Sequence, residues 1–254
     1  MGDAPLGEYT GFHEQLDNPV RHRELPSGKV VLLFGFGDPV RIEHARYSTG
    51  VVAALRERTA WTGHHGTQHG IAVCLDPLRA HAVFGMPMHL LSNRLVDSTA
   101  VLGPAGPRLT EQLAETPDWA TRFTLLDAAL ARLAAAGPVP DPAIAWAWRR
   151  LKSVPGTRIS LLAAELGWST RTLERKFNHQ IGLPPKTAAR VLRFDRAVRL
   201  LTARADMATV AAAAGYSDQS HFAREVRAFA DCPPSLLAAD RARIADIETG
   251  YVDR

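Results

Sequence analysis

The sequence predicts an α+β chain, with a β-rich first part that includes short helices and an all-α second part. Short apolar runs interrupted by Gly and Pro dominate residues 9–75, as is typical of strands and turns. From residue 109 onward, apolar residues recur at helical spacing. Within this helical part, residues 159–234 contain two copies of the same sequence pattern. These three observations separate two structural regions.

The repeated pattern predicts two helix-turn-helix motifs joined by a long helix from Pro185 to about Ala203. In both copies an Ala-rich helix ends at a Gly, and an aromatic residue and a Ser follow: Gly167-Trp168-Ser169 and Gly215-Tyr216-Ser217. Gly readily adopts the positive φ that ends a helix, and Ser or Asp caps the helix that comes next. Each second helix has an inward-facing apolar pair at i, i+4 spacing: Leu173 with Phe177, and Phe222 with Val226.

Residues 141–254 resemble the DNA-binding domain of AraC/XylS-type transcription regulators. Besides the paired motifs, the resemblance includes Gly182-Leu183-Pro184-Pro185 and Cys232-Pro233-Pro234, which follow the first and the second motif. The sequence departs from the pattern at Asp231, where a Gly is expected, so the turn after the second motif is open to change. The resemblance implies a sequence-specific DNA-binding transcription regulator rather than an enzyme. Its implied partners are double-stranded DNA, RNA polymerase and an unknown small-molecule effector, with no membrane partner.

Three apolar runs are the predicted strands of the N-terminal region: residues 29–37, 51–55 and 70–75. The Gly residues within this region mark places where a small barrel bends. Residues 1–106 resemble, more loosely, the cupin-like sensor domains found in front of AraC-type DNA-binding domains. This second resemblance implies a β-rich cupin-like barrel that senses an effector or forms dimers.

Two short helices are expected after the last of these strands. The first is capped by Asp76, begins at Pro77 and ends at Gly85, and residues 86–91 open the second. The sequence Gly103-Pro104-Ala105-Gly106-Pro107 predicts a break before the helices that follow.

Residues 107–137 are the predicted helical connector. Its long helix begins at Thr116-Pro117-Asp118, with Thr116 as the cap, and ends at Gly137-Pro138. An apolar stripe follows this helix at heptad-like spacing: Phe123, Leu126, Leu130 and Leu133. Either the stripe packs on its own barrel, or it forms a homodimer through residues 117–136, and two heptads do not decide between these interpretations.

The domain at 141–254 follows a stiff linker with three prolines, residues 137–142. Its first helix is expected at 144–154, with Ile144, Trp148 and Leu151 inward, and its last from Pro233-Pro234 to about Ile244, with a frayed tail after Ile247. The joining helix of about nineteen residues spans roughly 28 Å, somewhat less than the ~34 Å turn of B-DNA. We therefore expect a single chain to reach two adjacent major grooves, with the DNA bent toward it.

The outward positions of the two recognition helices, near 170–179 and 218–229, are the candidates for DNA contact. Arg pairs with guanine, Glu accepts from cytosine and Asn suits adenine, so side chains of these types favour base readout. The expected base contacts are Arg171, Glu174, Arg175, Asn178, Gln219, Ser220, Ala223 and Arg224. The resemblance implies the same role for six of them: Arg171, Glu174, Arg175, Gln219, Ser220 and Ala223. For Arg175 and Arg224, a phosphate contact or a partner within the fold is an equal alternative.

The basic charge of the chain is concentrated between Arg149 and Arg199, where 12 Lys/Arg stand against 3 Asp/Glu. This surplus indicates a polyanion-binding surface, although alone it would also fit a solvated Arg-rich face. The expected phosphate contacts are Lys152, Thr157, Ser160, Lys176, Lys186 and Arg227. Cys74 and Cys232 fall in different predicted domains, so a structural disulfide is not expected and the reducing cytoplasm fits.

One further cluster, His64-His65-Gly66-Thr67-Gln68-His69, raises the question of metal binding. It is either a metal site of a cupin barrel or a polar loop between two strands, and the cupin ligand spacing is absent from it. We therefore assign no catalytic residue, no metal ligand and no cofactor. The alternative function is a metal-dependent cupin-type enzyme that its basic helical domain tethers to DNA.

Overall fold

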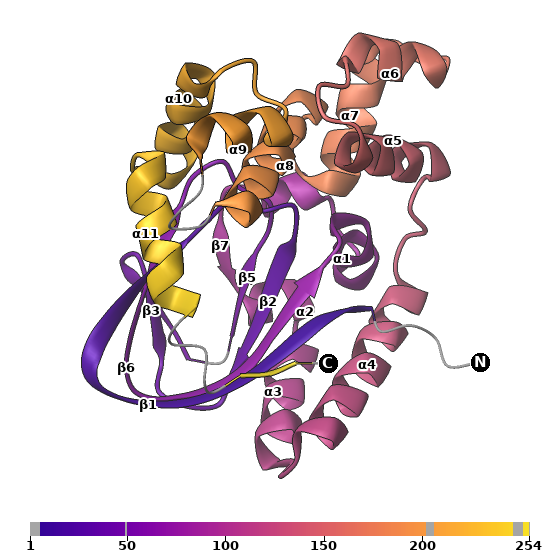
Figure 1. Cartoon of the computed structure of the whole chain (residues 1–254). Helices are drawn as coiled ribbons and strands as arrows, with labels where there is room; N and C mark the ends of the chain where they lie inside the picture. Colours follow the sequence, from indigo (N-terminus) through magenta and orange to yellow (C-terminus); the bar gives the residue numbers. More distant parts are fainter. Residues whose placement is uncertain (1–5, 49, 202–205, 246–250, 254) are drawn as a thin grey trace.

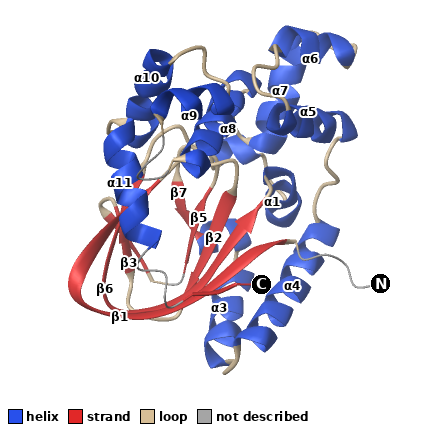
Figure 2. Cartoon of the chain, viewed as in Figure 1, coloured by secondary structure: helices blue, strands red, loops and turns tan. Residues whose placement is uncertain are grey.

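The structure is a computed structural model of the 254-residue chain, and it describes residues 6–48, 50–201, 206–245 and 251–253. A curved antiparallel sheet forms the N-terminal domain, and a bundle of short helices lies across one end of it (Figures 1 and 2). The predicted α+β architecture, with a near-barrel sheet before a helical domain, is confirmed. The strands are β1 (Gly7–Glu24), β2 (Val30–Gly35), β3 (Val40–Ile42), β4 (Ala45–Tyr47), β5 (Gly50–Ala53), β6 (Ala60–Leu75), β7 (Leu95–Asp97) and β8 (Tyr251–Asp253).

The long strand β6 is the centre of the sheet, whose order is β4-β3-β6-β2-β5-β7. Strand β1 pairs with β6 along almost its whole length, with an irregular register between Leu16 and Val20. In β2 the side chains alternate, and Val30, Leu32 and Phe34 are buried. The three predicted strands are present, but the pattern did not reveal β1, whose middle is largely polar.

The sequence 64–69 lies inside β6, so the prediction of a polar loop there is wrong. Pairing of these residues with Gln15, Leu16 and other parts of β1 supplies the hydrogen bonds that a strand needs. The polar composition is tolerated because one face of this long, curved strand pair is solvated. The C-terminal tail also differs from the prediction: β8 pairs with β1 at Thr10–Phe12 instead of fraying, while residues 246–250 and 254 lie outside the described residues.

The helices of the N-terminal domain are α1 (Pro77–Phe84), the 3-10 turn η1 (Met88–Leu90), α2 (Ser98–Leu102), α3 (Ala105–Glu115) and α4 (Trp119–Ala136). Helix α1 has the predicted ends: Asp76 accepts from the Leu78 amide at 3.1 Å, and Gly85 adopts φ 65°. The predicted break at 103–107 is partly wrong, because α3 already begins at Ala105. The cap of α4 is Asp118 and not Thr116, because the Asp118 carboxylate accepts from the Thr121 amide at 2.8 Å.

The apolar stripe on α4 belongs to the core of its own chain. Phe123, Leu126 and Leu130 are at most 3% exposed, and Leu133 is half-buried. Phe123 stacks on Tyr9 of β1, and the Tyr9 hydroxyl donates to Asp127. The hypothesis that this stripe forms a homodimer through residues 117–136 is therefore wrong for Phe123, Leu126 and Leu130, because these side chains are already covered.

The helical domain contains α5 (Pro142–Ser153), α6 (Ile159–Glu165), α7 (Thr170–Ile181), α8 (Pro185–Leu200), α9 (Met207–Ala214), α10 (Gln219–Ala230) and α11 (Pro234–Ala245). The first and last helices begin close to where they were predicted, and Ile144, Trp148 and Leu151 are buried. The joining helix α8 has 16 residues, and so spans about 24 Å rather than 28 Å. Residues 202–205, where its end was predicted, lie outside the described residues.

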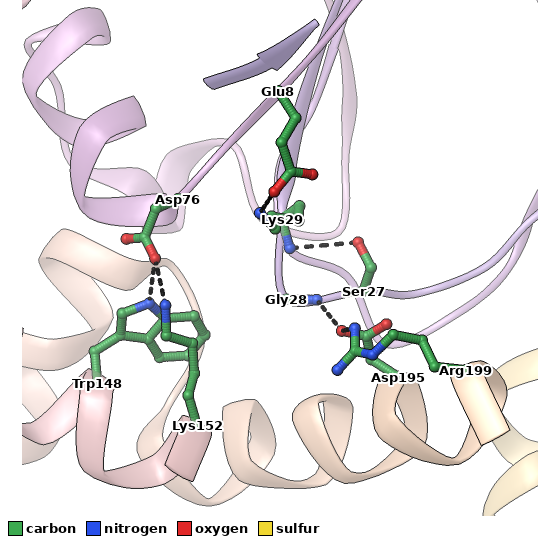
Figure 3. A network of polar contacts seen from close by, with 9 residues as sticks. All are labelled: Glu8, Ser27, Gly28, Lys29, Asp76, Trp148, Lys152, Asp195 and Arg199. Atoms are coloured by element: carbon green, nitrogen blue, oxygen red, sulfur yellow. Dashed lines mark hydrogen bonds and ion pairs between the residues drawn. The ribbon is translucent and has the colours of Figure 1, made fainter. Parts of the chain in front are cut away.

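The two domains are packed tightly against each other. The largest apolar cluster runs through both, from Leu32 and Met88 to Phe177 and Leu192. Polar contacts border it (Figure 3): Asp76 accepts from the Trp148 indole N–H and from Lys152 Nζ, both at 2.9 Å, and the Gly28 amide donates to Asp195 at 3.4 Å. The linker is short, but the helical domain shares its core with the sheet.

Candidate nucleic-acid interface

Helix α7 is positioned by the local sequence of the first motif. Gly167 adopts φ 66° after α6, and the Ser169 hydroxyl then accepts from the Thr172 amide at 3.2 Å, which caps α7. Leu173, Phe177 and Ile181 are fully buried and fix the rotation of the helix about its axis. The opposite side of α7 is consequently turned toward solvent.

Helix α10 repeats this arrangement in the second motif. Gly215 adopts φ 89° after α9, and the Asp218 carboxylate caps α10 by accepting from the His221 amide at 2.7 Å. Phe222, Val226 and Phe229 are buried. At the far end Asp231 takes the left-handed conformation with φ 55°, as Gly182 does after α7. The departure from Gly at 231 therefore preserves the turn.

Both recognition helices expose side chains in their first two turns. On α7 the exposed positions are Arg171, Glu174 and Arg175, and none of the three forms an ion pair with a described residue. On α10 they are Gln219, Ser220 and Arg224, with Ala223 half-buried and Arg227 exposed one turn later. Seven of the eight predicted base-contacting positions thus lie on the outer sides of α7 and α10.

Asn178 differs from the other candidates. It is half-buried, and its Oδ1 has no hydrogen-bond partner among the described residues. The next residue, His179, packs against the N-terminal domain, with ring centroids 5.4 Å from His81 and 6.2 Å from His89. Burial first, and then these two histidines, lower the pKa of His179. The second half of α7 is therefore the docking end of the helix.

A basic groove of about 560 Å³ lies between the turn before α6, one side of α8 and α10. Its lining includes Ser160 and Lys186, both exposed, together with Arg190, Arg193 and Arg196. These three arginines were not among the predicted DNA contacts. Their i, i+3, i+6 spacing would have placed them on one side of α8. Thr157 also lines the groove, but its hydroxyl already donates to the Val154 carbonyl at 2.7 Å.

The acidic residue of this groove, Glu225, organises two of its arginines. It accepts from Arg190 Nε at 2.7 Å and from Arg193 Nη2 at 2.9 Å. Burial alone would raise the pKa of Glu225, but the two guanidinium groups outweigh it, so the pKa lies below its usual range. Glu225 therefore holds α10 against α8, and Arg196 is held separately by the Lys152 carbonyl at 2.7 Å.

Two predicted phosphate contacts are engaged within the fold instead. Lys152 pairs with Asp76 at the domain interface, as described above. Lys176 pairs with Asp141 at 2.8 Å and lies over the Trp168 ring, 4.8 Å from its centroid. The bond from Lys176 lowers the pKa of Asp141. Both lysines stabilise the start of the helical domain in this arrangement.

One histidine of β6, His69, takes part in packing. His69 Nε2 lies 3.0 Å from Arg122 Nη1, and its ring stacks on His13 at 4.6 Å. Burial, followed by the charge of Arg122, lowers the pKa of His69. Among the described residues, no group of three or more His, Cys, Asp or Glu side chains has the arrangement of a metal site. In the same part of the chain, no helix has the length and apolarity to cross a membrane.

Comparison with known proteins agrees with this geometry. Residues 162–239, which include both motifs, match the model of a helix-turn-helix domain. The C-terminal region is an AraC-type helix-turn-helix domain. This AraC-type domain makes the chain a DNA-binding transcription regulator. No curated protein matches the chain.

Solved structures of ToxT from Vibrio cholerae share the fold across both domains. One is 7% identical, covers 92% of this chain and 98% of its own, and superimposes with a TM-score of 0.52. ToxT bound to (E)-4-(8-methylnaphthalen-1-yl)but-3-enoic acid is 9% identical, covers 92% and 99%, and reaches 0.54. ToxT bound to an unsaturated fatty acid is 9% identical, covers 94% and 97%, and reaches 0.50. At these identities the likeness concerns the fold alone.

Proposed function

We propose that α7 and α10 of one chain enter two successive major grooves of one DNA duplex. We also propose three parts of the chain: a sensor domain at residues 1–106, a helical connector at 107–137 and a DNA-binding domain at 141–254. The proposed base contacts are six exposed side chains of the first two turns and the half-buried Ala223. The six are Arg171, Glu174, Arg175, Gln219, Ser220 and Arg224. Their free donors and acceptors support base readout, because the rest of each helix is committed to the core.

The basic groove supports the phosphate contacts of the same proposal. Ser160, Thr157 and Lys186 lie along it, and the arginines of α8 form its floor. A sugar-phosphate backbone that passes between two occupied major grooves would meet this positive surface. Arg227 on α10 is the remaining phosphate contact. For Asn178, Lys152 and Lys176 a DNA contact would first require release from the partners or packing described above.

The regulatory part of the proposal concerns a small-molecule effector in the N-terminal domain. Two of the structurally similar ToxT structures hold small carboxylic acids, which supports effector binding by this architecture. RNA polymerase is the proposed further partner, since a regulator that is not itself an enzyme acts through it. We place this activity in the cytoplasm, where the free thiols of Cys74 and Cys232 remain reduced.

The experiment that tests the DNA-binding proposal is selection of bound duplexes from a random pool with the full chain, followed by footprinting. We expect two protected segments about 10 base pairs apart on one face of the duplex. Insertion of five base pairs between them should reduce the affinity to the level of random DNA, because the 16-residue α8 cannot follow half a turn. A single protected segment, or unchanged binding to the spaced site, would contradict the two-groove arrangement.

A further inference from the structure

A hollow of about 710 Å³ opens on the N-terminal domain, away from the residues assigned to DNA. Its walls are the β3–β4 hairpin, the loop that leads into β6, and the turn before β7. The apolar part of the lining is formed by Ile42, Tyr47 and Leu95. These residues belong to a small apolar cluster that is separate from the main core. The hollow therefore combines an apolar floor with polar loops.

Charged side chains of both signs line this hollow: Arg58, Arg94, Glu43 and Glu57. None of the four forms an ion pair with another described residue. Guanidinium groups only donate hydrogen bonds and carboxylates only accept them. The lining thus offers donors to an anionic group and acceptors to a cationic group at the same time.

Two further polar side chains of the hollow, Arg56 and Tyr47, already have hydrogen-bond partners. Arg56 Nη2 donates to the Glu24 carbonyl at 3.0 Å, and burial lowers the pKa of Arg56. The Tyr47 hydroxyl donates to the Leu95 carbonyl at 3.3 Å. Burial first, and then the charges of Asp97 and Glu43, raise the pKa of Tyr47. Glu43 is exposed and lines the hollow.

The walls are fastened to each other, so the site is formed before a ligand enters. Asn93 adopts φ 59°, and its Oδ1 accepts from the Glu57 amide at 2.8 Å. The Asn93 amide in turn donates to the Leu55 carbonyl at 3.1 Å. A pre-formed site binds more tightly, because little conformational entropy is lost when the ligand enters.

We propose that this hollow binds a small zwitterion with an apolar side chain, of the class of free apolar amino acids. The carboxylate pairs with Arg58 and Arg94, and the ammonium group pairs with Glu43 and Glu57. The apolar side chain lies on Tyr47 and its apolar neighbours. This assignment rests on the proposed regulatory function, since it supplies the effector site of that function.

Occupancy of the hollow acts on the second recognition helix through Thr59. This residue lines the hollow, and its amide donates to the Phe229 carbonyl, in the last turn of α10, at 3.0 Å. Its hydroxyl donates to the Glu24 carbonyl at 3.3 Å. A ligand that shifts this loop changes the position of α10, so ligand and DNA alter each other's affinity by the same factor.

Calorimetry on the full chain tests the site with matched probes. We expect at least one of L-leucine, L-phenylalanine and L-tryptophan to bind. For L-phenylalanine the matched probes are 3-phenylpropanoate and 2-phenylethylamine, each of which lacks one charge and should bind about tenfold more weakly or not at all. Leucine and tryptophan have the corresponding acids and amines. Absence of binding by all three amino acids, or equal binding by an amino acid and its matched acid, would overturn the assignment.

Paired substitutions locate the two charges. Arg58→Gln with Arg94→Gln, and separately Glu43→Gln with Glu57→Gln, should each weaken binding of the amino acid about tenfold. The control is Arg108→Gln with Glu111→Gln on α3, exposed residues outside the hollow, which should leave binding unchanged. Unchanged binding by either test pair, with the fold verified by circular dichroism, would place the ligand elsewhere.

DNA affinity measured with and without the amino acid separates the two proposals. We expect a several-fold change in DNA affinity that disappears in the Arg58→Gln/Arg94→Gln variant. If the chain binds the amino acid but no DNA, the proposed two-groove function is wrong and the proposed amino-acid site stands. If the chain binds DNA but no amino acid, the proposed DNA-binding function stands and the proposed amino-acid site is wrong. Independent binding of both would remove the coupling through Thr59.

Discussion

The two helix-turn-helix units are held to the N-terminal domain in different ways. The second half of α7 packs against α1 and η1, and the His179 ring lies 5.4 Å from that of His81 and 6.2 Å from that of His89. The end of α10 is instead held by hydrogen bonds to its carbonyl groups: the Thr59 amide donates to Phe229 and the Arg23 guanidinium to Ala230. The first unit is therefore anchored by packing and the second by polar contacts.

This difference indicates how the N-terminal domain could act on DNA binding. Both recognition helices are held at their C-terminal ends, while the first turns that carry Arg171 and Gln219 stay exposed. The sensor domain thus sets the relative position of the two helices without covering their reading sides. A hydrogen bond contributes only about 1 kcal/mol net, so a few of them are more readily exchanged than a large apolar interface. The second unit is consequently the one whose position an effector changes more easily.

Truncation of a core phenylalanine tests the packing side of this comparison and carries the largest expected effect. Phe177→Ala should lower the free energy of unfolding by about 3–5 kcal/mol, because a fully buried ring is removed. Its ring lies 6.1 Å from that of Trp148, which donates to Asp76 of the N-terminal domain. Urea unfolding gives the magnitude.

The matched variant is Phe229→Ala in the second unit, where the ring lies 5.0 Å from Phe194. Its loss in stability should be similar, but hydrogen exchange should differ. Phe177→Ala should accelerate exchange of the α1 and η1 amides, and Phe229→Ala should not. Equal acceleration in both variants would show that the two units are anchored alike.

Removal of the Glu225 charge tests how strongly polar contacts hold α10 against α8 within the helical domain. Glu225→Gln should cost about 2 kcal/mol at neutral pH, because Arg190 and Arg193 lose the carboxylate that they share. The lowered pKa of Glu225 gives its contribution a definite pH dependence. It is complete above the unfolded-state value of about 4.3 and is lost as the pH falls through the folded-state pKa.

Urea midpoints between pH 7 and pH 3 measure this dependence. The Glu225→Gln chain should lose less stability over that range than the wild type. Glu174→Gln, at an exposed carboxylate on α7 without an ion pair among the described residues, is the control and should follow the wild-type curve. If the urea midpoints of Glu225→Gln and of the wild type fall equally toward pH 3, the bridge contributes nothing to stability.

Local sequence was enough to predict the caps and inward faces of the helical domain, and it failed where distant parts of the chain decide. Asp76, Ser169 and Asp218 cap helices within a few residues of themselves, so their roles are visible in the sequence. The polar strand β1 was missed because pairing with β6 stabilises it and its middle lacks an apolar alternation. The docking of Thr59 and Arg23 on α10 depends on residues about 170 or more positions away, which no local pattern encodes.

The candidate site divides in the same way. Exposed positions of α7 and α10 follow from helical periodicity once the buried positions are known. Lys152 and Lys176 had the right charge, but their partners Asp76 and Asp141 become neighbours only in the folded chain. The sequence shows the arginines of α8 but not the groove that they line, because α10 and the turn before α6 also form its walls.

Substitution of one proposed base-contacting residue in each unit allows the contributions of the two units to DNA recognition to be compared. Arg171→Ala and Gln219→Ala should each lower affinity for the selected site by about 1–3 kcal/mol, and both should largely spare random DNA. Lys186→Ala should weaken both complexes alike, because a phosphate contact is independent of sequence. Fluorescence anisotropy on the two duplexes gives the ratio. An equal loss on both duplexes for Arg171→Ala would remove it from the base readers.

The smallest expected effect concerns the equivalent turns after α7 and α10, where the chain has Gly182 in one unit and Asp231 in the other. Both residues adopt positive φ, 104° and 55°. For Asp231→Gly, relief of the left-handed conformation gains about 1 kcal/mol. The greater freedom of Gly in the unfolded chain offsets about half of this gain. The net stabilisation of about 0.5 kcal/mol should raise Tm by about 1–2 °C.

A substitution at the equivalent turn of the first unit, Gly182→Ala, should change the stability in the opposite direction and by a larger amount. Its φ of 104° disfavours a side chain, and a Cβ there would meet the Ser92 hydroxyl and the Met88 carbonyl of the N-terminal domain. We expect a loss of more than about 1 kcal/mol, seen as a lower Tm in calorimetry. The two substitutions thus distinguish a turn that only closes a helix from one that also lies in the domain interface. If Asp231→Gly lowers Tm, the Asp231 side chain contributes a contact that outweighs its strained backbone, and the second turn is part of an interface as well.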